Sequence, residues 1–221
     1  QAASRRFFAE LLRELPPRRR LFAPADGPAA SFVSAHHTLE RATSRQLTAF
    51  ARRRGLTLAA TLHFAWAVWL AARLGQDDVV FGTTVSGRPA GVPGVERIIG
   101  LFINNLPVRL RLAAHDQPAE RLAALQSLLG ELQDHAHLSP TAVAEAAGAG
   151  SRGRPLFDTL VVVETLASGT SAWEDAEDMT VQTVHARPKT AYDLTFIAIP
   201  GDAIALSLVQ PDDGRTLEDG A

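Results

Sequence analysis

The sequence predicts an α+β fold. Segments with the apolar spacing of helices alternate irregularly with strand-like segments, and a run of antiparallel strands closes the chain. Its 221 residues are enough for one large domain or two small ones, with a sizeable core. Apolar residues make up 46% of the chain and charged residues 21%, which is typical of a globular protein.

The first two predicted helices are short and amphipathic. Residues 5–15 form the first, which ends at a pair of prolines, and an irregular link follows to about residue 30. We expect Thr43 or Ser44 to cap the second helix, because a hydroxyl there can accept a backbone hydrogen bond, and Gly55 to end it.

Three more helices are predicted farther along the chain. Thr57 can cap the third, which runs to Leu74 and is apolar on nearly every side, so we expect it to be packed all round. Gly75 follows it in the position where helices end. Asp116 is expected to cap the fourth, and Ser139, followed by proline, to cap the fifth.

The strands are predicted from apolar runs and from alternation. Residues 105–112 alternate between apolar and polar side chains, which indicates a strand with one face in water, and Pro107 favours an edge strand or a bulge. The polar segment 165–178 is expected to be an exposed loop. The predicted strands are 31–39, 77–87, 105–112, 157–164, 179–186, 192–199 and 203–210.

Composition excludes several classes of function. A net charge of −2 gives no electrostatic reason to expect nucleic acid or an anionic membrane as a partner. The absence of cysteine excludes disulfides, thiolate nucleophiles and cysteine-based zinc sites. The beginning of the sequence lacks the apolar core of a signal peptide, and the longest apolar run is too short for a bilayer. We therefore expect a cytoplasmic protein with no membrane contact.

The histidines are the first candidates for chemistry. His36 and His37 lie in a predicted strand, where consecutive side chains point to opposite faces, so they cannot share one ligand. We expect one of them to be packed and the other exposed. His63 is expected to be a hydrogen-bonded core residue, and His135 and His137 to lie at a helix end. We predict no metal site, no nucleophile motif and no phosphate-binding loop.

A longer stretch of sequence is more specific. The run from Gly75 to Leu112, GQDDVVFGTTVSGRPAGVPGVERIIGLFINNLPVRLRL, closely resembles the condensation domain of nonribosomal peptide synthetases. Within it, IGLFINNLPVR resembles the family motif (I/V)-G-x-F-x-N-T-x-x-x-R, with Asn104 and Arg109 at its asparagine and arginine. Asn105 stands where threonine is usual. The segment SRGRPLFDTLVVVET resembles the later family motif N-P-L-F-D-T-x-x-x-x-E-N, with both asparagines replaced.

The resemblance covers nearly the whole chain and implies a fold. Condensation domains belong to the chloramphenicol-acetyltransferase-like superfamily, so the chain is expected to be one lobe with a mixed or antiparallel sheet packed against helices. Residues 1–30 would be the linker helix and the connection between lobes. Residues 31–221 would be the carboxy-terminal lobe, without the amino-terminal lobe and without the last helix.

The resemblance also implies where the catalytic residues are. The family signature is H-H-x-x-x-D-G, and after His36 and His37 this chain has Arg41 and Ala42 in place of the aspartate and glycine. The signature belongs to the amino-terminal lobe, so no catalytic residue is expected here. In the family, amide bonds form between thioesters that carrier proteins deliver on phosphopantetheine arms, with no cofactor bound directly.

Five residues match positions of interest in the family. Ser86 matches a small polar residue near the acceptor amine, and Gly87 would let the backbone approach the pantetheine arm. Arg88, Asn104 and Arg109 match motif positions for which a structural role is favoured over a direct one.

The implied partners are the amino-terminal lobe, carrier proteins and the adjacent adenylation domain. Three functions stay open: an inactive fragment of an amide-forming enzyme, a docking module for carrier or adenylation domains, and a lobe of an epimerisation or heterocyclisation relative.

Overall fold

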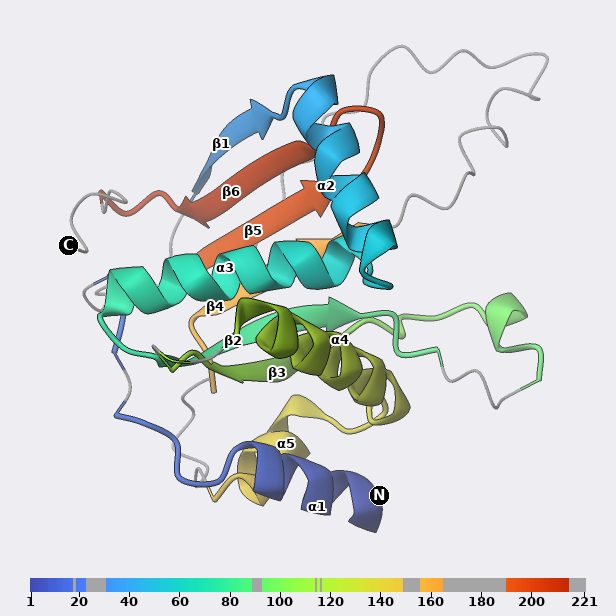
Figure 1. Cartoon of the computed structure of the whole chain (residues 1–221). Helices are drawn as coiled ribbons and strands as arrows, with labels where there is room; N and C mark the ends of the chain where they lie inside the picture. The colour runs from blue at the N-terminus through green and yellow to red at the C-terminus, as the bar shows by residue number, and fades with distance from the viewer. Residues whose placement is uncertain are drawn as a thin grey trace.

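A mixed six-stranded sheet forms the centre of the computed structural model, which describes residues 1–17, 19–22, 31–88, 93–113, 115, 117–148, 156–164 and 190–214 (Figure 1). The order of the strands is β1-β6-β5-β4-β2-β3, and β4 runs parallel to both of its neighbours, whereas all other pairs are antiparallel. The strands are β1 Phe32–Thr38, β2 Asp78–Val85, β3 Asn104–Arg111, β4 Thr159–Val163, β5 Leu194–Ile199 and β6 Ala205–Pro211. The α+β prediction is confirmed, while the strand and the loop expected at 179–186 and 165–178 lie outside the described residues.

Three helices cross one face of this sheet, and two lie beyond its β3 edge (Figure 1). The helices are α1 Ala2–Leu11, α2 Arg41–Arg53, α3 Leu58–Leu74, α4 Pro118–Asp134 and α5 Pro140–Ala146, with a 3-10 turn, η1, at Val95–Arg97. A continuous core joins α1, α3 and α4 to the sheet; its fully buried large side chains include Phe8, Leu12, Leu70, Phe81, Val108, Leu125, Leu132 and Leu194.

The predicted ends of α3 and the predicted cap of α5 are present. The Thr57 hydroxyl accepts a hydrogen bond from the Ala60 amide at 3.0 Å and begins α3. Gly75 ends the same helix with a φ of +59°, a left-handed conformation that glycine adopts without strain. Ser139 caps α5 by accepting from the Ala142 amide at 3.2 Å. Gln117 precedes α4, and the predicted cap Asp116 lies outside the described residues.

The predicted start of α2 was wrong. The helix begins at Arg41, with Glu40 before it, so Thr43 and Ser44 both lie inside the first turns. Ser44 is buried, and its hydroxyl accepts a hydrogen bond from the Ile204 amide at 3.0 Å instead of capping its own helix. The serine therefore ties α2 to the residues that precede β6.

Two expectations about burial were also wrong. The α3 helix is not packed all round by the described residues: Ala65, Val68 and Ala72, which fall on one stripe, are exposed. The polar side of β3 is only partly in water: Arg111 is exposed, but the turn after α1 lies against Arg109 and buries it. The edge position that Pro107 predicted is confirmed, since β3 ends the sheet.

In the described part of the chain, no single helix has the length and apolar composition to cross a membrane. Taken together, α2 and α3 pass that test by length and composition alone, but they meet at a bend of 106°.

Candidate functional site

The histidine pair does not form a site. His36 and His37 lie on β1, and both are exposed, so the expectation that one is packed was wrong. Side chains on both faces of β1 are exposed, so the described residues cover neither face of the strand at this pair. His36 forms hydrogen bonds with the hydroxyls of Ser34 and Ser207 at 2.9 and 2.8 Å.

Three further histidines, His63, His135 and His137, form hydrogen bonds within the fold. His63 is buried between the Ala59 carbonyl and the Thr83 hydroxyl, each 2.7 Å away, as expected of a core histidine. His135 and His137 follow α4, and each lies 3.2 Å from the Ser4 hydroxyl on α1. Among the described residues, no group of three or more acidic or histidine side chains could hold a metal ion.

The carboxyl end of β2 carries three of the residues that the sequence selected. Ser86 is exposed directly after the strand, and Gly87 follows with a φ of +62°. A Cβ atom on Gly87 would lie 1.9 Å from the Phe102 carbonyl oxygen, so close approach of two backbone segments requires glycine here. The partner that comes closest to Gly87 is therefore the chain leading into β3.

Arg88 joins the same two segments through its side chain. One terminal nitrogen donates hydrogen bonds to the carbonyl oxygens of Val95 and Ile98, and the guanidinium carbon lies 4.4 Å from the centre of the Phe102 ring. The second contact is a cation–π arrangement, which at exposed sites contributes about 0.5–1 kcal/mol. Arg88 thus holds the connection between β2 and β3.

Asn104 has a clear structural role at the start of β3. Its amide nitrogen donates to the carbonyl oxygens of Ala136 and Leu138, each at 2.8 Å, and its amide oxygen accepts from the Asn105 backbone at 2.9 Å. These bonds tie β3 to the turn between α4 and α5.

Arg109 is buried, and hydrogen bonds within the fold occupy all five of its N–H donors. Two bonds, at 2.9 and 2.6 Å, go to the two carboxylate oxygens of Asp78 on the neighbouring strand. The other three go to the backbone carbonyl of Leu11, the last residue of α1, and to those of Arg13 and Glu14 in the turn after it. An arginine with five occupied donors has none left for a ligand, so its position is explained by its contacts within the fold.

The structure brings some of these residues together and separates one. Because Val85 pairs with Asn104, the segment from Ser86 to Arg88 lies beside the start of β3. Arg109 lies five residues farther along β3, which at the rise of a strand is about 17 Å away.

Sequence reasoning missed a polar chain that adjoins Ser86. Thr84 donates to the Asn105 amide oxygen at 2.9 Å, and the Asn105 amide nitrogen donates to the Tyr192 hydroxyl at 3.1 Å. The Tyr192 ring stacks on Phe157 with 5.3 Å between centres. Thr84 and Ser86 are two residues apart at the end of a strand, so their side chains are expected on the same face of the sheet. That spacing could have indicated the polar chain from the sequence.

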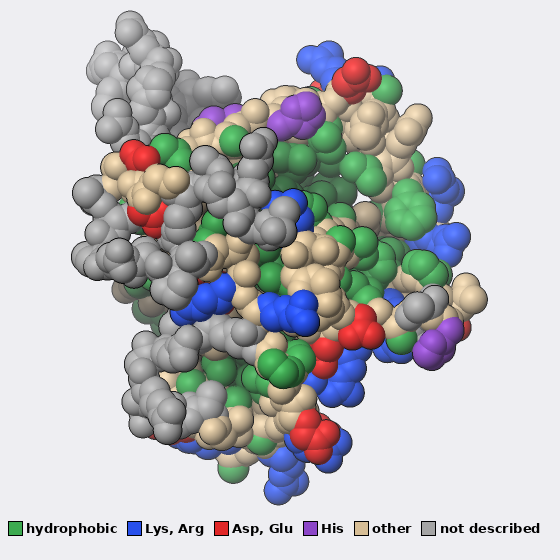
Figure 2. Space-filling model, turned by 90° about the vertical axis from the view of Figure 1, so that its left-hand side faces the viewer, with side chains coloured by type: hydrophobic (Ala, Val, Ile, Leu, Met, Phe, Trp, Pro, Cys, Tyr) green, Lys and Arg blue, Asp and Glu red, His purple; other side chains and the backbone are tan. Residues whose placement is uncertain are grey.

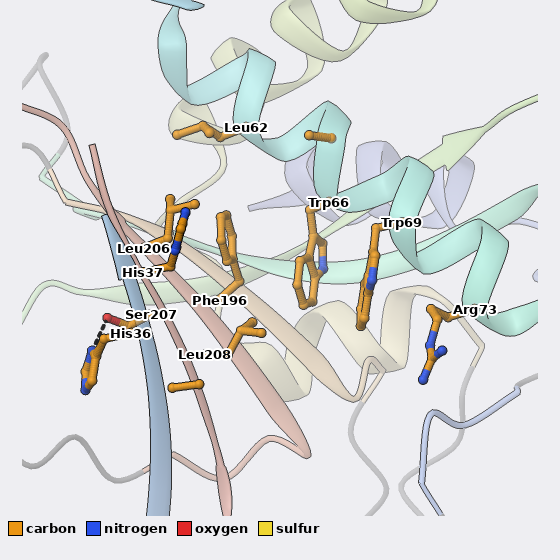
Figure 3. A pocket seen from close by; sticks show the side chains of 12 residues that line it. His36, His37, Leu62, Trp66, Trp69, Arg73, Phe196, Leu206, Ser207 and Leu208 are labelled. Atoms are coloured by element: carbon orange, nitrogen blue, oxygen red, sulfur yellow. Dashed lines mark hydrogen bonds between the residues drawn. The ribbon is translucent and has the colours of Figure 1, made fainter. Parts of the chain in front are cut away.

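A second feature is an apolar groove of about 580 Å³ between α3 and strands β1, β5 and β6 (Figure 3). Figure 3 shows Trp66 and Trp69 descending from α3 toward Phe196, and the rings stack with 4.7 and 5.2 Å between successive centres. Arg73 lies at one end of the groove and His37 at the other. Figure 2 shows hydrophobic side chains gathered in a hollow on this side of the molecule.

Comparison with known proteins identifies the family. The family model described as "Condensation domain" matches residues 2–209, which is nearly the whole chain. The chain belongs to the condensation-domain family. One component protein of the linear gramicidin synthase of Brevibacillus parabrevis is 38% identical over 170 residues, which are 77% of this chain and 3% of that protein. Vanchrobactin synthetase of Vibrio anguillarum is 35% identical over 182 residues, which are 81% of this chain and 6% of the synthetase.

Solved condensation domains share the fold of this one. A four-domain nonribosomal peptide synthetase superposes with a TM-score of 0.81 at 17% identity, covering 98% of this chain and 18% of that one. The condensation domain of the monacolin K polyketide synthase superposes with a TM-score of 0.76 at 17% identity. The superposition covers 99% of this chain and 54% of that one. The resemblance inferred from the Gly75–Leu112 run is confirmed, and this condensation-domain chain spans about half of that solved domain and a few per cent of the curated synthetases.

Proposed function

We propose that the chain is the carboxy-terminal lobe of a condensation domain that forms amide bonds in a nonribosomal peptide synthetase. The observation that carries the proposal is the family match over residues 2–209, together with superposition of 99% of the chain on 54% of a solved condensation domain. Residues 31–221 would be the lobe, and residues 1–30 its connection to the amino-terminal lobe.

The reaction would need two substrates held as thioesters by carrier proteins. The acceptor amine attacks the donor carbonyl, the new C–N bond forms as the C–S bond breaks, and the donor thiol leaves with a proton while the amine loses one. Positioning of the amine and exclusion of water supply much of the acceleration in such a step. The residues that handle the proton would belong to the amino-terminal lobe, whereas this chain would supply one wall of the reaction chamber.

Ser86 and Gly87 are the proposed contribution of this chain to that wall. Ser86 is exposed at the end of β2, two residues after Thr84, which begins the polar chain through Asn105 to Tyr192. A hydroxyl there can accept a hydrogen bond from an amine or donate one to a pantetheine amide. At Gly87 the Phe102 carbonyl fills the space that a side chain would take, so its contribution would come from the backbone alone. The proposed partners are the amino-terminal lobe, carrier proteins and an adjacent adenylation domain.

The first test separates the enzyme lobe from a docking module. We expect the 221-residue chain alone to form no amide with loaded carrier proteins, and addition of the amino-terminal lobe to restore product, measured by mass spectrometry. Carrier binding without product after the lobes are combined would support the docking module. Epimerised or cyclised product would indicate one of the related domain types, and turnover by the chain alone would contradict the fragment interpretation.

The second test concerns Ser86. In the whole domain, we expect Ser86→Ala to lower turnover about tenfold, because one hydrogen bond lost from the transition state is worth about 1–1.5 kcal/mol. Ser127→Ala is the matched control, since that exposed serine on α4 bonds only to the Ala123 carbonyl of its own helix among the hydrogen bonds described. If both variants turn over substrate at equal rates and melt at unchanged temperatures, Ser86 does not contribute to the reaction in the chamber.

A further inference from the structure

A tyrosine hydroxyl ends the polar chain that starts at Thr84. Thr84 donates to the Asn105 amide oxygen at 2.9 Å, so the amide nitrogen of Asn105 faces the other way, 3.1 Å from the Tyr192 hydroxyl oxygen. Because an amide nitrogen only donates, the phenol oxygen accepts this bond and keeps its own hydrogen. No hydrogen bond among the described residues uses that hydrogen. Tyr192 therefore has one donor available for a ligand.

Several contacts fix the ring that carries this hydroxyl. The ring stacks on Phe157 with 5.3 Å between centres and 19° between planes. Phe157 lies against Gly82, where a Cβ atom would be 2.1 Å from the ring, so the stack requires glycine at that position. The Tyr192 amide donates to the Thr190 hydroxyl at 3.2 Å. A phenylalanine would satisfy the stack equally well, so packing alone does not account for the hydroxyl.

The hydroxyl is held at the face of the sheet on which Ser86 is expected. Gly82, Thr84 and Ser86 alternate along β2 and past its end, so their side chains share one face. Asn105 is the cross-strand partner of Thr84. At the rise of a strand, the Cα atoms of Thr84 and Ser86 are about 7 Å apart, which is short enough for one tethered substrate to contact both ends of this group.

We propose that the Tyr192 hydroxyl donates a hydrogen bond to a carbonyl oxygen of the carrier-tethered substrate, and that Asn105 is the positioning residue that orients it; this rests on the proposed function. Two kinds of carbonyl oxygen would enter the chamber: that of the reacting thioester, which becomes anionic as the amine attacks, and those of the pantetheine amides. Both are acceptors that match a lone donor. Accepting from Asn105 strengthens the phenol as a donor, since hydrogen bonds in a chain polarise one another.

Asparagine fits this role better than the threonine that is usual at position 105 of the family motif. The amide of Asn105 has a separate acceptor and donor, so it bonds to Thr84 and Tyr192 together. Threonine is one bond shorter, so its hydroxyl can pair with Thr84 but stops short of Tyr192. Asn105→Thr is therefore a variant that removes only the second bond.

Turnover by the whole domain, with both lobes, tests the hydroxyl. We expect Tyr192→Phe to lower kcat/KM about tenfold, because one hydrogen bond to the substrate is lost while the stack on Phe157 remains. Asn105→Thr should lower it about threefold, and the double variant should match Tyr192→Phe, because Asn105 acts only through the tyrosine. Thr48→Val is the matched control, since it removes a hydroxyl that bonds to the Ser44 carbonyl within α2, and kcat/KM should not change. Unchanged kcat/KM in Tyr192→Phe, or losses that multiply in the double variant, would overturn the inference.

A second substrate distinguishes the two kinds of carbonyl. The donor is supplied as an aminoacyl ethyl thioester, which keeps the reacting carbonyl and has no pantetheine amides. If the loss in Tyr192→Phe persists with this donor, the hydroxyl acts on the reacting carbonyl. If the loss appears only with the carrier-tethered donor, the hydroxyl holds the pantetheine arm.

Binding separates this inference from the proposed function. If the wild-type whole domain forms no amide, the proposed function is wrong. The affinity for a carrier protein whose arm holds the amino acid as a stable amide then decides the inference. Binding about tenfold weaker in Tyr192→Phe than in the wild type would support it, and equal binding would overturn it.

Discussion

Replacing Arg109 by alanine is expected to lower the free energy of unfolding by about 3–5 kcal/mol, the cost of removing one partner from a buried ion pair. The Asp78 carboxylate loses two hydrogen bonds, at 2.9 and 2.6 Å, and its side chain is only 19% exposed. The carbonyls of Leu11, Arg13 and Glu14 lose their donors in the same change. Glu14 has a φ of +52°, a conformation that non-glycine residues rarely adopt, so the turn after α1 depends on this support. Urea denaturation followed by circular dichroism measures the loss.

Arg111→Ala is the matched control, because both arginines bind the same carboxylate. Arg111 reaches Asp78 at 3.2 Å, but its side chain is 61% exposed, and an exposed ion pair of this kind contributes less than about 1 kcal/mol. Equal losses in the two variants would contradict the assignment of Arg109 as the buried support. If Arg109→Ala does not fold, Arg109→Lys keeps the charge without the fork and should still be less stable than Arg111→Ala.

The features that the sequence predicted correctly are those with local causes. Thr57, Ser139 and Gly75 act within one turn of their own helices, so the hydroxyl cap and the left-handed glycine follow from residue type and spacing. Pro107 cannot donate a hydrogen bond to a second neighbouring strand, which restricts it to an edge.

The wrong predictions involve partners that are distant in the sequence. Ser44 has the right chemistry for a helix cap, but Ile204, 160 residues away, supplies the amide that it accepts from. Arg109 alternates with leucine and valine as a solvent-facing residue would, and only the packing of the turn after α1 makes it a buried one. Periodicity reports which side of a strand a residue occupies, and it carries no information about what later covers that side.

The same limit applies to the candidate site. The adjacency of Ser86, Gly87 and Arg88 is written in the sequence, and so is their place after a buried strand. The sequence does not show why residue 87 must be glycine, because the Phe102 carbonyl that excludes a side chain comes from the chain leading into the next strand. The hydrogen bond between Asn105 and Tyr192 joins residues 87 apart, and no local pattern indicates it.

The stability of the domain is expected to fall by about 3 kcal/mol as the pH is lowered from 6.5 to 4, through His63 alone. Burial lowers the pKa of His63 from 6.5 to about 4, while its hydrogen bond to the Ala59 carbonyl opposes the shift in part. Because that carbonyl can only accept, Nδ1 carries the proton, and Nε2 accepts from the Thr83 hydroxyl. Between these pH values the unfolded chain binds a proton at His63, whereas the folded chain binds it only as the pH approaches 4. Acid therefore favours unfolding. The contribution is fully present above pH 6.5 and is lost by about pH 4.

His63→Gln isolates this contribution from that of the carboxylates, which titrate mainly below about pH 5. The free energy of unfolding, measured in urea from about pH 7.5 to 5, should fall more steeply in the wild type than in the variant, whatever the variant's overall loss. His36→Gln, at an exposed position on β1, is the control for the histidine-to-glutamine change itself. Parallel curves for the wild type and His63→Gln would show that position 63 takes up protons equally in the folded and unfolded states. Below about pH 6.5 the buried bond between α3 and β2 would then be formed by a charged imidazolium, and the apolar packing around it would have to tolerate that charge.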